Sequence, residues 1–246
     1  MTCDWTPLRD ALAQCRRDGL AIPLWWRDDD AVAPTKALEQ LQALAGELGL
    51  PIHLAIIPAQ AQESLAEAVH GMIPVVHGWA HQDHSNPSEK KNEFQTPRPD
   101  ATGETALALR GMCDLVGARL CPMFVPPWNR INSDVTQALA PQGYSTLSTF
   151  GPRAAAHAAP GLVQINTHID PIWWKGSRDL IDPDALIAQT VDHLTARRRG
   201  TEDAREPLGL LTHHLVHTPA IWSFTRAFLH EMLSGGATPW AMENTE

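Results

Sequence analysis

Short apolar runs alternate along this chain with longer segments in which apolar residues recur at helical spacing. Each run has the length of a buried strand and ends at a glycine, a proline or a polar residue. The runs lie at residues 21–26, 52–57, 73–76, 122–125, 145–150, 162–167 and 208–212. Strands that alternate with helices are typical of a parallel sheet, so we predict an α/β fold, a seven-stranded barrel with its helices outside.

The predicted helices are bounded by residues that commonly cap helix ends. Thr35 and Gly49 flank a leucine-rich segment, and Pro183 and Pro219 each stand in the first turn of a later helix. Further helices are expected at residues 6–18, 60–69, 104–118 and 133–140. Residues 85–100 are polar and predict a long loop, with one helical turn near residues 89–91. Loops of this length often cover a binding site, so this one is expected to influence substrate choice.

Composition supports one globular unit. A length of 246 residues suits a single α/β barrel, and because no linker divides the chain we predict one domain over residues 1–246. Hydrophobic residues make up 43% of the chain and charged residues 19%, which is enough apolar material for one large core.

Net charge and cysteine content narrow the possible partners and the compartment. A net charge of −9 argues against nucleic acid or an anionic membrane as partner, because both require a positive surface. The four cysteines form no close pairs, and no apolar stretch reaches the ~18 residues that would span a membrane. The first residues also lack the basic start and apolar core of a secretion signal. We therefore expect a cytoplasmic protein with reduced thiols.

The candidate chemistry lies where predicted strands end. His77 and His81 follow the strand at 73–76, and Asp28, Asp29 and Asp30 follow the first strand. Two histidines at this spacing are, by themselves, more often part of a solvated loop. The acids in the equivalent place after another strand favour a metal site, and zinc in hydrolytic sites typically takes three protein ligands.

Other polar and aromatic residues occupy the same predicted edge. Trp128 and Asn129 follow the strand at 122–125, Asp170 follows the strand at 162–167, and His214 follows the last strand. In parallel barrels, catalytic groups project from the carboxyl ends of the strands. The sequence therefore predicts a single site at this edge.

These motifs, in this order, resemble the polysaccharide deacetylase family, also called the NodB homology domain or carbohydrate esterase family 4. The resemblance extends from about Leu24 to His217. It implies a distorted seven-stranded barrel that binds zinc or a similar divalent ion and removes acetyl groups from N- or O-acetylated sugars. The substrate class expected from it is an acetylated carbohydrate or a small amide.

The first two motifs of the family assign the base and the metal ligands. An Asp-Asp pair after a strand is matched by Asp29-Asp30, with Asp29 as general base and Asp30 as ligand, although the register Asp28-Asp29 is also possible. The His-x-x-x-His motif is matched by His77 and His81 as the other two ligands. Trp79, between these histidines, is expected to stack on a sugar.

The third and fourth motifs are incomplete. Residues 125–129 are similar to an Arg-Pro-Pro-Tyr-Gly motif but lack its arginine, which braces the catalytic aspartate in the family. Arg27 or Arg130 could take that place, and the resemblance assigns the backbone amide of Trp128 to the oxyanion. The fourth motif is similar to residues 170–174, in which Trp173 replaces the second acid. Asn129 and Asp170 are expected to contact substrate.

The fifth motif is similar to residues 208–214 and indicates His214 as general acid, with His213 as the alternative. Alternation along the strand places Leu208, Leu210, Thr212 and His214 on one face, which predicts an apolar substrate pocket that includes Leu210.

Two other functions compete with a metal-dependent deacetylase. The lost arginine and acid are also compatible with a non-catalytic barrel that binds sugar or metal. A metal-independent glycoside hydrolase could use the carboxylates of Asp29 and Asp170, but it would leave His77 and His81 without a function.

Overall fold

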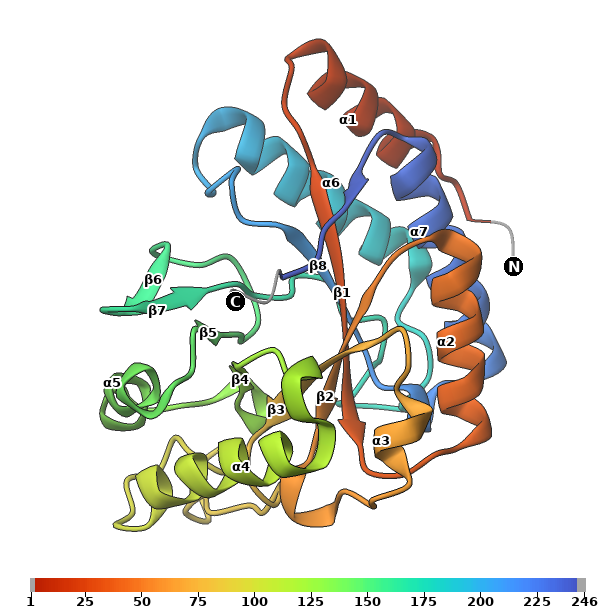
Figure 1. Ribbon diagram of the computed structural model, residues 1–246. Coiled ribbons are helices and arrows are strands. Elements are labelled where there is room, and N and C mark those ends of the chain that lie inside the picture. The colour runs from red at the N-terminus through yellow and green to blue at the C-terminus, as the bar shows by residue number, and fades with distance from the viewer. Residues whose placement is uncertain (1–2, 243–246) are drawn as a thin grey trace.

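The computed structural model describes residues 3–242, and the strands in that part of the chain form one curled sheet (Figure 1). The strands are ordered β6-β7-β5-β4-β3-β2-β1-β8, and all neighbours are parallel except β6 and β7. The bounds are β1 Pro23–Ala31, β2 Ile52–Ile56, β3 Ile73–His77, β4 Met123–Val125, β5 Thr146–Leu147, β6 His157–Ala159, β7 Leu162–Gln164, β8 Leu208–Thr212 and β9 Thr238–Pro239. The predicted α/β barrel is confirmed, with β6 and β9 as additions.

The helices lie outside the sheet, with α2, α6 and α7 beside β1 and β8, and α4 beside β3 and β4 (Figure 1). Their bounds are α1 Thr6–Arg17, α2 Lys36–Leu48, α3 Leu65–Ala68, α4 Ala101–Val116, α5 Ser133–Gln142, α6 Pro183–Arg199 and α7 Pro219–Ser234. Short 3-10 turns are η1 Pro58–Gln60, η2 Gly117–Arg119, η3 Pro127–Asn129 and η4 His214–Val216. The Thr35 hydroxyl accepts a hydrogen bond from the amide of Leu38 at 3.0 Å, and Gly49 ends α2 in a left-handed conformation, as their types predict.

Two predicted segments differ from the structure. The helix expected at 60–69 is reduced to the single turn α3, because the amide of Gln62 donates to the carbonyl of Val32 and holds the preceding residues against the end of β1. Residues 85–100 contain no helical turn near residues 89–91. Part of this segment is core, since Glu93 and Phe94 have no exposed surface.

The strands carry apolar side chains on both faces. Trp26 and Leu210 pack in the large core between sheet and helices, whereas Trp25 and Val125 belong to a smaller cluster inside the barrel. Because successive side chains of a strand alternate, the inner face of β1 continues from Trp25 to Arg27 and Asp29. This alternation decides which polar residues face the interior.

The amino-terminal end of the barrel interior is filled by the segment that follows α7. β9 pairs with the start of β1, and Trp240 stacks on His53 with their rings 5.7 Å apart. His53 has no exposed surface, and its Nε2 accepts a hydrogen bond from the amide of Met242 at 3.1 Å. His53 is therefore a core histidine, as its place early in the strand predicts.

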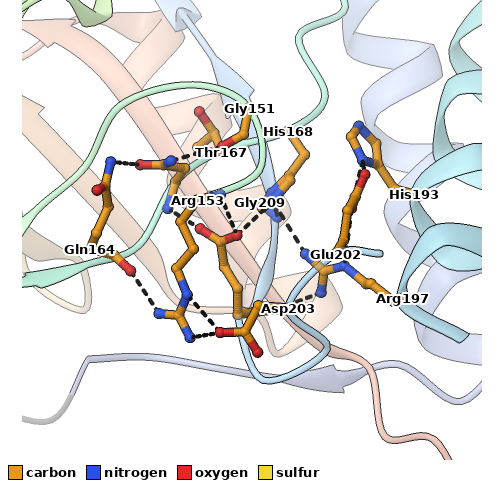
Figure 2. Close-up of polar contacts among 12 residues, drawn as sticks. Gly151, Arg153, Gln164, Thr167, His168, His193, Arg197, Glu202, Asp203 and Gly209 are labelled. Atoms are coloured by element: carbon orange, nitrogen blue, oxygen red, sulfur yellow. Dashed lines mark hydrogen bonds and ion pairs between the residues drawn. The ribbon is translucent and has the colours of Figure 1, made fainter. Parts of the chain in front are cut away.

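A buried polar network connects β7 and β8 (Figure 2), and Ile169, in the segment after β7, forms a parallel bridge with Leu210 of β8. Glu206 accepts hydrogen bonds from the amides of Arg153 and Asn166 at 3.0 and 2.9 Å. It also lies 3.3 Å from Nε2 of His168, and Arg197 donates to the carbonyl of Glu206. His168, which follows the strand at 162–167, thus belongs to this polar network between β7 and β8.

Among residues 3–242, every helix is too short or too polar to cross a lipid bilayer.

Candidate metal and catalytic site

Asp30, His77 and His81 converge where β1 and β3 end. Their ligand atoms all lie within 4.8 Å of one another, with Oδ1 of Asp30 3.1 Å from Nε2 of His77 and 3.3 Å from Nε2 of His81. Nδ1 of His77 donates to the carbonyl of Val125 at 3.0 Å, which leaves the Nε2 lone pair of the neutral ring facing the carboxylate. Acceptor atoms that face each other at this distance require a proton or a cation between them.

The chemistry of this triad fits a divalent metal ion. Two imidazoles and one carboxylate are a donor set that zinc and similar ions take in hydrolytic enzymes. Burial opposes the charge on His77, but the nearby carboxylates of Asp29 and Asp30 outweigh it and raise the pKa of His77. Asp30 and His81 both have left-handed backbones, with φ of 75° and 56°. Such strain persists where the surroundings fix a functional geometry.

The loop between the two histidines is held by Glu93. Its carboxylate accepts hydrogen bonds from the backbone amides of Trp79 and Ala80 at 3.2 and 2.8 Å. Burial raises the pKa of Glu93, which has no exposed surface. Gly78 has a φ of 58°, and a Cβ there would lie 2.3 Å from Oε2 of Glu93 and 2.4 Å from Cδ of Pro127. Sequence reasoning missed Glu93 because it lies in the segment at residues 85–100, which was predicted to be a long polar loop.

Arg27 braces Asp29 on the inner face of β1. Its Nε and Nη2 donate to the two carboxylate oxygens of Asp29 at 2.9 and 3.0 Å, and Nη2 also donates to Oδ1 of Asn129 at 2.8 Å. Arg27 has no exposed surface and Asp29 is 2% exposed. Arg130 instead donates to the carbonyl of Lys91. Arg27 therefore makes the contact with Asp29 that the resemblance assigns to the arginine missing from residues 125–129.

Asp28 and His214 form a second pair, on the outer face of the sheet. Nδ1 of His214 lies 2.5 Å from Oδ1 of Asp28, and the Thr212 hydroxyl donates to the other carboxylate oxygen at 2.5 Å. Burial disfavours protonation of His214, but the adjacent Asp28 outweighs it and raises the pKa of the ring. His214 is only 1% exposed, and its Nε2 is buried without a hydrogen-bond partner in residues 3–242.

His213 is the histidine on the inner side of the last strand. It alternates with Leu211, which pairs in register with Arg27. The ring of His213 packs edge-on against Trp174 at 4.7 Å and is partly exposed. A positive charge on it would lower the pKa of both Asp30 and Asp170. Both His213 and His214 lie near enough to Asp30 to interact with its charge, and His213 is the more exposed of the two.

The remaining predicted site residues have different surroundings. Trp128 packs on His81, with ring centroids 4.3 Å apart, and its φ of 57° turns the chain sharply after β4.

Asp170 accepts hydrogen bonds from the amide of Ile172 and from Nε1 of Trp174, and burial raises the pKa of its carboxyl. Trp79 is half-buried and packs against the large core, which leaves less of its ring for stacking on a sugar.

The expected pocket at Leu210 needs correction. Leu210 is 0% exposed and packs between the sheet and the helices. The face shared by Leu208, Leu210 and Thr212 points outward. The error arises because β8 is apolar on both faces, so its pattern does not reveal which face looks inward.

Four exposed apolar side chains in the segments after the strands were not predicted as a group. Phe150, Trp173, Trp174 and Leu215 are 41%, 54%, 38% and 46% exposed, and each lies in a segment that follows a strand leading to this edge. The sequence could have indicated this group, because each of these residues ends or follows a predicted strand.

Comparison with known proteins identifies the fold. No protein-family model and no curated protein sequence matches the chain. Solved structures do match. A Mycobacterium smegmatis protein described as a polysaccharide deacetylase has a TM-score of 0.62 and 15% identity, over 93% of this chain and 96% of that one. A family 4 carbohydrate esterase from Streptomyces lividans in complex with acetate has a TM-score of 0.55 and 12% identity, over 91% and 93%.

A third similar structure is a CE4-family pseudoenzyme from Bacillus anthracis, with a TM-score of 0.55 and 12% identity, over 89% of this chain and 63% of that one. The class that these likenesses define is the polysaccharide deacetylase fold. The chain has this fold in a divergent form, and the resemblance carried by its motifs is confirmed at the level of structure.

Proposed function

We propose that this protein is a metal-dependent hydrolase that removes an acetyl group from an acetylated carbohydrate or a small acetylated amide. The observation that carries the proposal is the convergence of Asp30, His77 and His81 next to a carboxylate, Asp29, that a buried arginine holds in place. The solved structures of the same fold include deacetylases, which supports this reaction class.

Asp30, His77 and His81 would hold the ion, with zinc as the first candidate. When bound, a divalent ion supplies polarisation of the acyl carbonyl and lowers the pKa of water. Asp29, fixed by Arg27, accepts the proton of the attacking water as general base. The backbone amide of Trp128, at the turn after β4, donates to the oxyanion that develops on the carbonyl.

We assign the general acid to His213. A general acid has to reach the leaving group, and alternation along β8 puts His213 on the inner face with Arg27 and Asp29, whereas His214 contacts Asp28 on the outer face. His213 protonates the departing nitrogen or oxygen of the substrate. His214, paired with Asp28, then supports the end of β8 from its outer side.

A non-catalytic function is the second candidate, since structures of this fold include pseudoenzymes. For this chain, the argument from the lost arginine is weakened because Arg27 contacts Asp29 from within β1. A metal-independent glycoside hydrolase remains a weaker alternative, because the triad would then have no function.

Replacing the base tests the proposal. Asp29→Asn keeps a hydrogen-bond acceptor for Arg27 but removes the basic carboxylate, so the turnover number for acetate release should fall by about 10²- to 10⁴-fold. Metal binding, measured by titration calorimetry, should stay as in the unmodified chain. Asp10→Asn, at an exposed position of α1, serves as the control and should keep full turnover. Undiminished turnover in Asp29→Asn would rule out the assignment.

A further inference from the structure

A polar cavity of about 440 Å³ lies beside the candidate site. Its walls come from the segment after β4, the first turns of α5, the end of β5 and the hairpin of β6 and β7. Cavities that bind small molecules typically measure about 300–1,000 Å³, so this one has room for a sugar-sized group. It is far larger than an acetyl group requires.

Two residues join the cavity to the catalytic groups. Asn129 and Thr149 both line it. The side chain of Asn129 and the backbone carbonyl of Thr149 accept hydrogen bonds from the guanidinium of Arg27, at 2.8 and 3.3 Å. Arg27 in turn holds Asp29. Arg27 thus connects Asn129 in the cavity wall to Asp29 through hydrogen bonds.

The lining selects for neutral hydrogen-bonding groups. Amide and hydroxyl side chains dominate it, with Arg130 as the charged residue and no acid among the described residues that form the walls. Each amide offers both a donor and an acceptor, which matches sugar hydroxyls, because every hydroxyl also does both. A cationic group would find no carboxylate here, and an extended apolar group would leave the amides unpaired.

Gln164 forms a prearranged part of the wall. Figure 2 shows it beside Arg153, whose guanidinium donates to the backbone carbonyl of Gln164 at 2.7 Å and pairs with Asp203. Nε2 of Gln164 donates to Thr149 and Asn166, both at 3.3 Å, while its Oε1 has no partner in residues 3–242. The polar network between β7 and β8 thus fixes Gln164 and leaves its Oε1 atom free to accept a hydrogen bond from a ligand.

Gln137 completes the opposite wall. It is exposed on α5, lines the cavity and makes no side-chain hydrogen bond in the described part of the chain. Replacing it removes donor and acceptor groups from the cavity without breaking an internal contact.

We infer that this cavity receives the polyhydroxylated leaving group of the substrate, with Gln137 and Gln164 as specificity residues. The inference rests on the proposed function and specifies it further: the leaving group is a neutral sugar, held on the side of β5 and β7. Trp173 and Trp174, in the segment after β7, do not line this cavity.

Two measurements test the inference with Gln137→Ala and Gln164→Leu. Acetate release is compared for the N-acetylglucosamine disaccharide and for phenyl acetate, which carries the same acetyl group on a leaving group without hydroxyls. Each variant should raise KM for the disaccharide about 5- to 10-fold, the effect of one lost hydrogen bond, with kcat nearly unchanged and no change for phenyl acetate. Gln40→Ala, at an exposed position of α2 without a side-chain hydrogen bond in residues 3–242, is the matched control.

Binding of the disaccharide to the metal-free protein, measured by titration calorimetry, separates the two claims. Binding that both variants weaken supports the cavity assignment, and if no acetate is released the proposed function fails while the assignment stands. Equal binding by variants and unmodified chain, or none at all, overturns the assignment whatever the turnover. An equal loss on both substrates also overturns it. Because Gln137 is exposed, its variant remains informative even if Gln164→Leu does not fold.

Discussion

Residues 27–30 of β1 each make a different contact. Alternation points Arg27 and Asp29 into the barrel, where they pair, and points Asp28 outward to His214. The left-handed backbone of Asp30 then turns its carboxylate to the histidines. One strand thus supplies the proposed base, the arginine that holds it, a candidate metal ligand and the partner of a buried histidine.

The two adjacent histidines after β8 should respond differently to the same substitution. His213→Gln should lower the turnover number by about 10²- to 10⁴-fold while the protein stays as stable, because it removes the general acid from the inner face. His214→Gln should mainly lower the free energy of unfolding, since it separates a buried charged pair. Kinetics and urea denaturation of both variants check this. A stable His214→Gln protein with the greater loss of turnover would reverse the assignment.

Much of the site can be predicted from the sequence, and the features that could not be predicted have a common physical cause. Asp30, His77 and His81 stand at strand ends, where parallel topology brings distant segments together, so their convergence is predictable. The role of Arg27 and the choice between His213 and His214 depend on which face of a strand looks inward. Strands that are apolar on both faces do not encode that choice.

The segment between His77 and His81 shows how a neighbouring element fixes the candidate metal ligands. Backbone amides of this segment donate to Glu93, and Gly78 allows the chain to pass close to Pro127. The helix expected at 60–69 and the loop at 85–100 were less predictable, because tertiary contacts at Val32 and Glu93 override their local patterns.

Gly78→Ala tests this support against a matched glycine. Both Gly78 and Gly71 have positive φ, of 58° and 78°, but a Cβ at Gly71 would meet nothing within 4 Å. Each alanine should cost about 1–2 kcal/mol for the left-handed backbone. Only Gly78→Ala should also displace Glu93 and weaken metal binding, by about 10- to 100-fold. Equal metal affinity in the two variants, measured by calorimetry, would show that this support does not matter.

At the scale of the whole molecule, the barrel is closed by residues distant in sequence. Trp240 and Met242 cover His53 at one end, and the Glu206 network joins β7 to β8. His53 Nε2 accepts from the amide of Met242, so the ring has to stay neutral. Burial accordingly lowers the pKa of His53 to about 4.

This histidine makes folding stability depend on pH. Because the pKa of His53 is lower in the folded chain than its ordinary 6.5, the unfolded chain takes up the proton more readily. The neutral His53 ring contributes about 3 kcal/mol to the free energy of unfolding. This contribution is complete above pH 6.5 and is lost as the pH falls toward 4. His53→Gln should reduce the pH dependence of the free energy of unfolding over this range. An unchanged dependence in chemical denaturation would contradict the account.

The most direct measurement is acetate release from acetylated sugars by the purified chain, before and after removal of metal. The account predicts release in the presence of a divalent ion, loss of release with a chelator, and recovery when zinc or a similar ion is restored. A metal-loaded protein that releases no acetate from any acetylated sugar or small amide would contradict it, as would release that persists undiminished after the metal has been removed.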